Sequence, residues 1–374
     1  MRIPVAAEGW PFIFPPAVAA CILALMGWPI AAGVLAVVAL AVLAFFRDPE
    51  RVVPTLPGAV LAPADGKVMG VVEVEDRWVG RAVRLSIFLS PLDVHVNRAP
   101  AVLRQRGLIS RLRAIDLGDV TPPAYQDFTR PADRARNEDQ VIAYSRALAE
   151  RVSAAIAHGQ FGLVIGGDCS IVLACLLAAR KKAGDALGLV YADAHADYAT
   201  AEESRSGSAA SMALAMAPGR DHTPMSRLAG AMSLVHDRRT ALIGRRVAHQ
   251  EWYGLAALAA SSILDVPSVQ LQRDDGQYLA ELTLDHVAQP DGRGFWIQVD
   301  ADVLDPAAMA AVDSPEPGGV TPRELLRVLT PLVRHPRALG LSLTTYDPAL
   351  DPDRSCARRL VNLLEALLAP GLLH

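Results

Sequence analysis

Hydrophobic positions first form a long uncharged stretch near the start of the chain. No charged residue occurs between Glu8 and Arg47, and the stretch is broken at Gly27-Trp28-Pro29. The two apolar arms, 11–26 and 30–46, hold 16 and 17 residues. A helix of that length rises roughly 25 Å, slightly short of the ~20 residues that span a bilayer comfortably. The pattern predicts a tight membrane hairpin within residues 1–47.

Basic residues flank this stretch on both sides. Arg2 precedes it, and Arg47 and Arg51 follow it. Because basic flanks stay on the cytoplasmic side of a membrane, we expect a membrane-associated protein with both ends of the hairpin in the cytoplasm. A cleaved signal peptide fits poorly, because the apolar region is too long and is interrupted.

From about residue 101 the pattern alternates between helical and strand spacing. Apolar residues recur at helical spacing between 136 and 158, whereas the apolar run 187–192 is typical of a buried strand. Thr321-Pro322-Arg323-Glu324 is a helix start, with Thr as the N-cap and Pro and Glu in the first turn. The expected helices are 136–158, 170–182, 321 onward and 355–368, and the expected strands are 161–165, 187–192, 295–299 and 338–344. Such alternation predicts a three-layer α/β fold, in which helices cover both faces of a parallel sheet.

Acidic residues and one histidine gather at the ends of two expected strands. Asp193, His195 and Asp197 follow strand 187–192, and Asp300 and Asp302 follow strand 295–299. Alternate residues of a strand share a face, and ligand sites collect at the carboxyl ends of parallel strands, so we expect these side chains to converge. Hard oxygen ligands with one imidazole suit Mn²⁺ or a similar divalent ion. Acidic residues also serve as turn formers or helix caps, but two such clusters favour a metal site.

Composition adds two exclusions. The formal net charge is −4 with both signs mixed along the chain, so no nucleic-acid-binding surface is evident. The four cysteines, Cys21, Cys169, Cys175 and Cys356, show neither paired spacing nor a zinc-ribbon pattern. A disulfide framework is therefore not expected, and a reducing compartment fits better.

Motifs in the first hundred residues occur in a recognisable order. The apolar stretch is followed by F-F-R-D-P at 45–49, P-A-D-G-K at 63–67 and S-P-L-D-V-H-V-N-R at 90–98. This order resembles the phosphatidylserine decarboxylase family. In that family an Asp and a His, matching Asp65 and His95, assist self-cleavage at a Gly-Ser bond, which generates a pyruvoyl group.

The rest of that machinery is missing from this sequence. No family-like Gly-Ser motif follows in a matching context, and Gly207-Ser208 lies in the second half of the chain. Without a pyruvoyl group there is no electron sink for decarboxylation. We therefore expect no decarboxylase activity, and an ordinary β-turn at Asp65-Gly66.

The second part of the chain, about 101–374, resembles the arginase–agmatinase (ureohydrolase) family. Three signatures carry the resemblance: G-G-D-C-S at 166–170, D-A-H-A-D at 193–197 and D-A-D-V-L-D-P at 300–306. In that family two Mn²⁺ ions are bridged by two aspartates, which match Asp193 and Asp300 and which the resemblance makes the catalytic pair. The resemblance implies Cys169, Asp193, Asp197 and Asp300 around the first ion, and Asp193, His195, Asp300 and Asp302 around the second. Two ions sharing carboxylates lower the pKa of a water between them and direct it at an electrophilic carbon.

Three positions depart from the arginase pattern. Cys169 stands where the family has His; it is either a small buried thiol beside a tight turn or a thiolate ligand that favours Zn²⁺ over Mn²⁺. The resemblance implies that Ala210 replaces a His that acts in the family as a proton shuttle. It also implies that Thr345 replaces the carboxylate that binds the guanidinium group. A guanidinium group needs a bidentate carboxylate partner, so these changes predict a substrate other than arginine.

These expectations combine into a membrane hairpin at 1–47, a truncated decarboxylase-like β segment at 48–100 and an arginase-like domain at 101–374. Ureohydrolases begin with a strand and a loop that are missing here, and the β segment occupies their place; whether it replaces them, and whether the junction is natural, stay open. The expected function is metal-dependent hydrolysis of a carbon–nitrogen bond in a small amidine or guanidine-like substrate, and a homo-oligomer is compatible with the sequence. The alternatives are a catalytically silent metal-binding or scaffold protein and, less favoured, a membrane-bound phosphatidylserine decarboxylase.

Overall fold

The computed structural model describes residues 10–45, 67–76, 80–88, 96–121, 131, 133–204, 206–230, 232–247 and 254–369. The chain divides into two compact units, Met1–Asp65 and Gly66–His374. Each unit is considered by itself.

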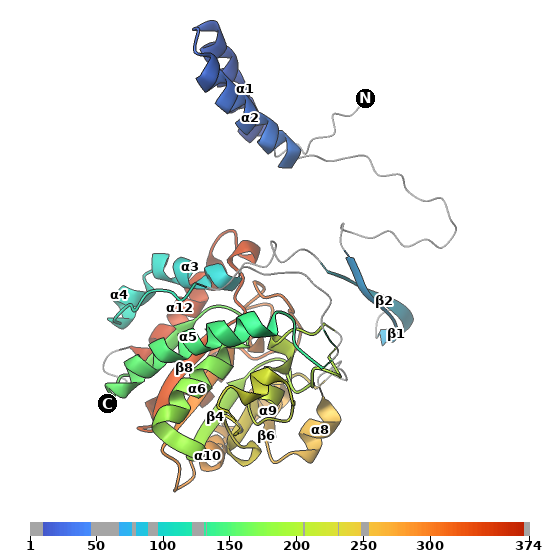
Figure 1. Ribbon diagram of the computed structural model, residues 1–374. Helices are drawn as coiled ribbons and strands as arrows, with labels where there is room; N and C mark the ends of the chain where they lie inside the picture. Colours follow the sequence, from blue (N-terminus) through green and yellow to red (C-terminus); the bar gives the residue numbers. More distant parts are fainter. Residues whose placement is uncertain are drawn as a thin grey trace. The chain divides into compact units, whose positions relative to one another are not determined.

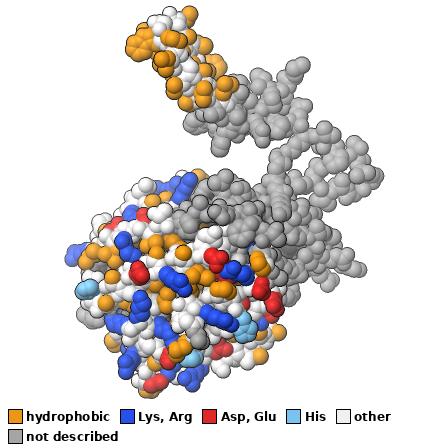
Figure 2. All heavy atoms as spheres, in the orientation of Figure 1, with side chains coloured by type: hydrophobic (Ala, Val, Ile, Leu, Met, Phe, Trp, Pro, Cys, Tyr) orange, Lys and Arg blue, Asp and Glu red, His pale blue; other side chains and the backbone are white. Residues whose placement is uncertain are grey.

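The first unit is a pair of apolar helices (Figure 1). Helix α1 spans Trp10–Leu25 and α2 spans Pro29–Phe45, and the two pack against each other across a turn at Gly27, whose φ is +78°. Their outer surface is hydrophobic, with Leu25 90% and Ile30 85% exposed (Figure 2).

The hairpin that the sequence predicts is present, but the prediction that it spans a membrane is not supported. Its helices hold 16 and 17 residues. Among the described residues, no helix has the length and apolar character that crossing a bilayer requires.

The second unit begins with a two-stranded antiparallel ribbon. Strand β1 spans Lys67–Asp76 and β2 spans Gly80–Phe88, with Lys67 opposite Phe88 and Asp76 opposite Gly80. The ribbon agrees with the β-rich expectation for this segment. Asp65 and His95, with the turn expected at Asp65-Gly66, lie outside the described residues.

A six-stranded parallel sheet forms the centre of the second unit. Its order is β3-β8-β7-β4-β5-β6, so β3 and β6 are the edges. The strands are β3 (Gly162–Ile165), β4 (Leu187–Ala192), β5 (Thr240–Ile243), β6 (Leu264–Val266), β7 (Gly294–Asp300) and β8 (Ala338–Thr344). The four expected strands are confirmed. Strands β5 and β6, of four and three residues, were not expected from the sequence.

Helices cover both faces of this sheet, as the alternation predicts. Successive residues of β4 point to opposite faces: Leu189 and Tyr191 pack with α5 and α6, whereas Val190 and Ala192 pack into the core that contains α11 and α12. The helices are α3 (Ala99–Gln105), α4 (Leu108–Leu112), α5 (Glu138–Ala157), α6 (Ile171–Ala183), α7 (Ala213–Met216), α8 (Leu255–Ala260), α9 (Ser268–Arg273), α10 (Gly276–Val287), α11 (Pro322–Arg334) and α12 (Ser355–Leu368). The three-layer α/β architecture is confirmed.

Two helix starts bear on the sequence predictions. Thr321 caps α11: its hydroxyl accepts from the Glu324 N–H and the Glu324 carboxylate accepts from the Thr321 N–H, which is the expected capping box. Helix α3 begins at Ala99 and packs against α12, so the expected junction between residues 100 and 101 falls inside a helix.

Candidate metal centre

The loop after β3 depends on two glycines. Gly166 has φ +96° and Gly167 has φ +72°, and a Cβ atom on Gly166 would lie 2.7 Å from the ring of Pro100. Only glycine adopts this region without strain. The tight turn places Cys169 just before α6, with its side chain directed at the end of β7.

The D-A-H-A-D segment converges for a different reason from the one predicted. Strand β4 ends at Ala192, so Asp193, His195 and Asp197 do not continue a strand with alternating faces. Instead the His195 N–H donates to Asp193 Oδ1 at 2.7 Å, and Asp197 adopts φ +46°. A turn, rather than strand periodicity, folds this segment.

Asp300 and Asp302 also meet through a turn. Asp300 is the last residue of β7, and Asp302 lies in the 3₁₀ turn that follows. The Asp302 N–H donates to Asp300 Oδ1 at 2.8 Å, and Asp302 Oδ1 accepts from the Ala194 N–H at 3.1 Å. These bonds connect the ends of the neighbouring strands β4 and β7.

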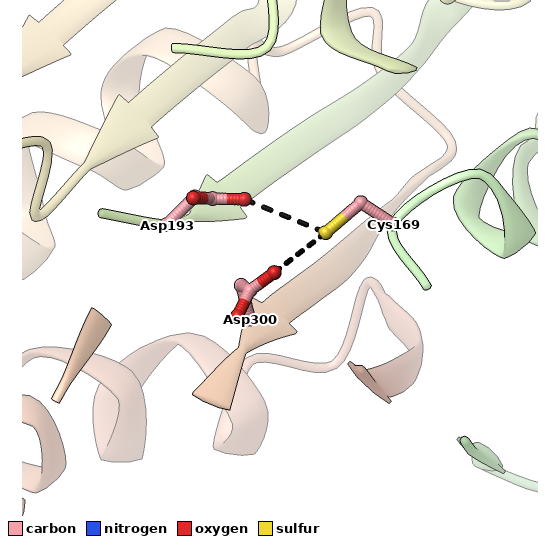
Figure 3. Close-up of side chains that lie close together, drawn as sticks. All are labelled: Cys169, Asp193 and Asp300. Atoms are coloured by element: carbon pink, nitrogen blue, oxygen red, sulfur yellow. Dashed lines mark hydrogen bonds between the residues drawn. The ribbon is translucent and has the colours of Figure 1, made fainter. Parts of the chain in front are cut away.

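The first donor group joins three chain segments (Figure 3). Cys169 Sγ lies 2.7 Å from Asp300 Oδ2 and 3.6 Å from Asp193 Oδ2. One ligand atom from each residue lies within 4.8 Å of the others, and all three residues are buried. Thr345 donates its hydroxyl to the other oxygen of Asp300.

The second donor group shares Asp193 with the first. It consists of Asp193, His195 and Asp302, whose ligand atoms also lie within 4.8 Å of one another. His195 Nδ1 is 3.0 Å from Asp302 Oδ2 and 3.6 Å from Asp193 Oδ1. The two groups therefore form one continuous cluster with Asp193 common to both.

Two positions of the predicted ligand sets differ from this geometry. Asp197 belongs to neither group among the described residues, and its Oδ2 accepts a hydrogen bond from the Tyr191 hydroxyl at 2.8 Å. Asp300, expected around both ions, is grouped only with Cys169 and Asp193. The structure thus brings together five of the six predicted ligands and holds Asp197 beside them.

The buried charges perturb one another strongly. Burial, and then the charge of Asp302, raises the pKa of Asp193 to about 6, and the same two causes raise the pKa of Asp300. Burial also raises the pKa of the Cys169 thiol, with Asp300 and Asp193 adding to it. Burial opposes ionisation of Asp302 and His195, but hydrogen bonding to Asp193 and then to Asp302 raises the pKa of His195, and the bond with His195 lowers the pKa of Asp302.

This donor set fits divalent cations. Several buried carboxylates in one small volume repel one another and are costly to ionise without a compensating positive charge. Carboxylate oxygens with an imidazole suit Mn²⁺, whereas the thiol of Cys169 suits a softer ion such as Zn²⁺. The donors establish that a metal can be held, and they leave its identity to experiment.

Sequence reasoning missed several residues that support or face the cluster. The Arg246 guanidinium donates to the backbone carbonyls of Gly244 (3.0 Å), Asp302 (2.8 Å) and Val303 (3.1 Å), which fixes the turn after β7. Glu316 Oε1 lies 3.9 Å from His195 Nε2. The signal for Arg246 was weak, because the pair Arg245-Arg246 after a short strand is typical of surface charge.

A cavity of about 1190 Å³ adjoins the cluster. Its lining includes Asp168, Ala210, Asp313 and Thr345 together with residues of β3 and α5. Ala210 and Thr345, the two substituted positions of the arginase pattern, thus line one cavity, and Thr345 contacts the first donor group through Asp300. The fold and the site together define an α/β enzyme with a candidate centre for divalent metal ions at the carboxyl edge of a parallel sheet.

Comparison with known proteins identifies the family. The sequence model of the arginase family matches residues 94–369. The chain is 29% identical over 300 residues to an arginase of Bacillus subtilis (strain 168), covering 77% of this chain and 99% of that protein. The native arginase structure from Bacillus caldovelox superposes with a TM-score of 0.68 at 27% identity, covering 74% of this chain and 95% of that one. The chain belongs to the arginase family and is a hydrolase.

A second match concerns a shorter stretch. The chain is 48% identical over 97 residues to a phosphatidylserine decarboxylase proenzyme of Nitrosomonas eutropha, which covers 26% of this chain and 45% of that protein. Both predicted resemblances are confirmed. The chain spans less than half of that decarboxylase, so the match carries no activity by itself.

Proposed function

We propose that the chain is a metal-dependent hydrolase that breaks a carbon–nitrogen bond of an amidine or guanidine-like substrate other than arginine. The observation that carries this proposal is the pair of donor groups that share Asp193 at the carboxyl edge of the sheet. Divalent ions, when bound, supply Lewis-acid activation of a water molecule for attack on the substrate carbon.

The residues of the chain have distinct roles in this proposal. Asp193 is the shared ligand; Cys169 and Asp300 complete the first group, and His195 and Asp302 the second. Arg246 is a positioning residue, because its guanidinium donates to the carbonyls of Asp302, Val303 and Leu304 and so holds the turn after β7. Asp197 is a further ligand of the first group in this proposal. To bind an ion through Oδ2, it would have to give up its hydrogen bond with the Tyr191 hydroxyl.

Arginine is disfavoured by the two substituted positions. Thr345 cannot supply a bidentate carboxylate, and its hydroxyl is already bonded to Asp300. Ala210 has no group that exchanges a proton. Loss of one transition-state contact of this kind costs roughly 10²–10³ in rate. We expect urea release from arginine far below the ~10 s⁻¹ of a typical enzyme, and a rate near that value would show that these positions are assigned wrongly.

The test is a substrate panel on metal-loaded full-length protein. Urea or ammonia release is measured with guanidines and amidines of different size, after loading with Mn²⁺ and, separately, with Zn²⁺. Asp302→Asn removes one ligand charge and should abolish turnover, whereas Asp285→Asn, on the exposed face of α10, should not change it. Absence of turnover with every substrate and both metals would favour the silent scaffold instead.

We further propose that the helical hairpin associates with a lipid surface on the cytoplasmic side. Large apolar side chains of both helices are exposed, among them Leu25 (90%), Ile30 (85%) and Val37 (66%). Burying such side chains in the interface region of a bilayer is favourable without a full span. Flotation with phosphatidylglycerol-containing vesicles tests this. The full-length chain should float with the vesicles, and a chain lacking residues 1–45 should remain at the bottom of the gradient. Equal flotation of the two chains would reject the proposal.

A further inference from the structure

The cavity beside the metal cluster is much longer than a guanidine group. It follows β3, an edge strand that pairs only with β8 among the described residues. On α5 its apolar lining residues are Val141, Tyr144, Leu148, Val152 and Ala155, and Gln140 and Arg151 line it as well. Fourteen residues separate Val141 from Ala155, so the cavity runs roughly 21 Å along the helix.

Apolar side chains dominate this length of the cavity. Leu163 and Ile165 line it from β3, and Leu108, Ile115 and Leu117 line it from the segment before α5. Figure 2 shows hydrophobic side chains interspersed with Lys and Arg side chains on the face where α5 lies in Figure 1. A volume of about 1190 Å³ exceeds what a drug-sized ligand usually occupies, roughly 300–1,000 Å³. Charged side chains, among them Arg104, Arg113 and Arg151, also line the cavity. Its apolar part suits an extended apolar group.

The end of the cavity nearest the metal cluster is acidic. Asp313 lines it together with Thr345 and Ala210. The loop that carries Asp313 is fixed on both sides: Asp305 Oδ2 accepts from the N–H groups of Gly318 (3.0 Å) and Gly319 (3.1 Å), and the Asp347 N–H donates to the Ala311 carbonyl at 2.9 Å. The neighbouring Val312 side chain is buried, whereas that of Asp313 is accessible from the cavity.

Asp313 lines the same cavity as Thr345, whose hydroxyl donates to Asp300 of the first donor group. The Asp313 side chain is exposed to the cavity, and the surrounding protein atoms, and then the charge of Asp302, raise its pKa. A carboxylate in a recess of this kind pairs well with a planar cation that donates hydrogen bonds.

We propose that this enzyme acts on a substrate with a guanidinium or amidinium head and an extended apolar tail, in which Asp313 binds the head and the cavity along β3 and α5 binds the tail. Asp313 would thus provide, from the loop after β7, the negative charge that Thr345 does not provide after β8. The inference rests on the proposed hydrolase function and adds the substrate class and a specificity-determining residue to it.

The first test measures binding of n-alkylguanidines, from methylguanidine to octylguanidine, to Mn²⁺-loaded full-length protein by calorimetry. Each buried methylene should tighten binding roughly threefold to fourfold. Octylguanidine should therefore bind at least about 10²-fold more tightly than methylguanidine. Affinities that do not change with chain length would overturn the proposal.

The head and the tail are then tested separately with matched variants. Asp313→Asn should weaken octylguanidine binding roughly 10-fold to 100-fold and leave neutral octylurea unaffected, whereas Asp285→Asn should change neither. Val141→Phe fills the cavity and should reduce the ratio of octylguanidine to methylguanidine affinity; Ala143→Phe, on the exposed side of the same helix, should leave that ratio unchanged. Equal effects of Asp313→Asn on the guanidine and the urea would contradict the role of the carboxylate.

Binding and turnover distinguish the two proposals. Chain-length-dependent binding without urea release would reject the hydrolase and keep the cavity as a binding site. Urea release from methylguanidine without any chain-length dependence would reject the tail site and keep the hydrolase. Thermal melting identifies any variant that has failed to fold. In that case the alkylguanidine series on the unmodified protein still tests the tail site.

Discussion

Replacement of Cys169 is the most informative single change at the metal cluster. Cys169 stands at the position where the arginase family has a histidine. Its Sγ atom lies 2.7 Å from Asp300 Oδ2 and 3.6 Å from Asp193 Oδ2, and the side chain is only 2% exposed. Cys169→His would supply an imidazole nitrogen, and Cys169→Ala would remove the donor without crowding the turn. Cys356→Ala, another buried thiol on α12, is the matched control.

The magnitude follows from the proton that a thiol must lose before it can bind a metal. The ordinary thiol pKa of 9.0 lies two units above pH 7, and at 1.36 kcal/mol per unit deprotonation costs about 2.7 kcal/mol, or about 100-fold in affinity. Burial and the two aspartates raise this pKa further, so the figure is a lower bound. A neutral histidine has almost no such cost at pH 7. Mn²⁺ should therefore bind the first group of Cys169→His at least about 100-fold more tightly, whereas Zn²⁺, which favours thiolate, should gain less.

Calorimetric titration of Mn²⁺ and Zn²⁺ into the three variants and the unmodified protein measures this selectivity. If Cys169 is a ligand, Cys169→Ala should weaken Zn²⁺ binding at one position and Cys356→Ala should not. The same Zn²⁺-to-Mn²⁺ preference in all four proteins would refute the reasoning. Cys169 would then be a packed thiol, and Cys169→His would only lower the melting temperature.

Other changes give equally definite expectations. Asp300→Ala should remove the first bound ion and, if Asp300 bridges as the resemblance implies, the second as well. Asp302→Ala should chiefly remove the second and leave an ion nearer Cys169 than His195; anomalous scattering at the manganese edge would count and place the ions, and a remaining ion nearer His195 would contradict the assignment. Gly166→Ala and Gly159→Ala both place alanine at positive φ, at +96° and +77°, which costs about 1–2 kcal/mol. Only Gly166 has Pro100 at 2.7 Å from the added Cβ atom, so its variant should lose about 1–3 kcal/mol more in denaturant unfolding; equal losses would show that the loop relaxes.

The long, regular elements of the second unit could be predicted from the sequence because their local signals are strong. Strand β4 has the predicted bounds Leu187–Ala192, and α11 starts at a capping box that four consecutive residues define. Strands β5 and β6 were not predicted; β6, with three residues, is too short to show a period. The hairpin helices were predicted correctly, but their membrane-spanning character was inferred from apolarity, and their length does not support it.

The candidate site was predictable in its residues and not in its geometry. Metal ligands of suitable type stand out at strand ends, so Asp193 and Asp300 could be chosen from the sequence. How they meet depends on turns, such as the hydrogen bond from the His195 N–H to Asp193 Oδ1, which no strand periodicity describes. Asp313 carries no motif and faces the cavity only because its loop folds back through contacts with distant residues, so the sequence alone gave no reason to choose it.

The metal content of the purified protein tests the central claim most directly. The protein is expressed in medium supplemented with Mn²⁺ and Zn²⁺, dialysed against metal-free buffer, and analysed by atomic emission alongside Asp193→Ala, which removes the residue common to both donor groups. The two groups predict about two ions per chain in the unmodified protein and none in the variant. No stoichiometric metal in the unmodified protein, or the same content in both, would contradict a metal centre at this cluster.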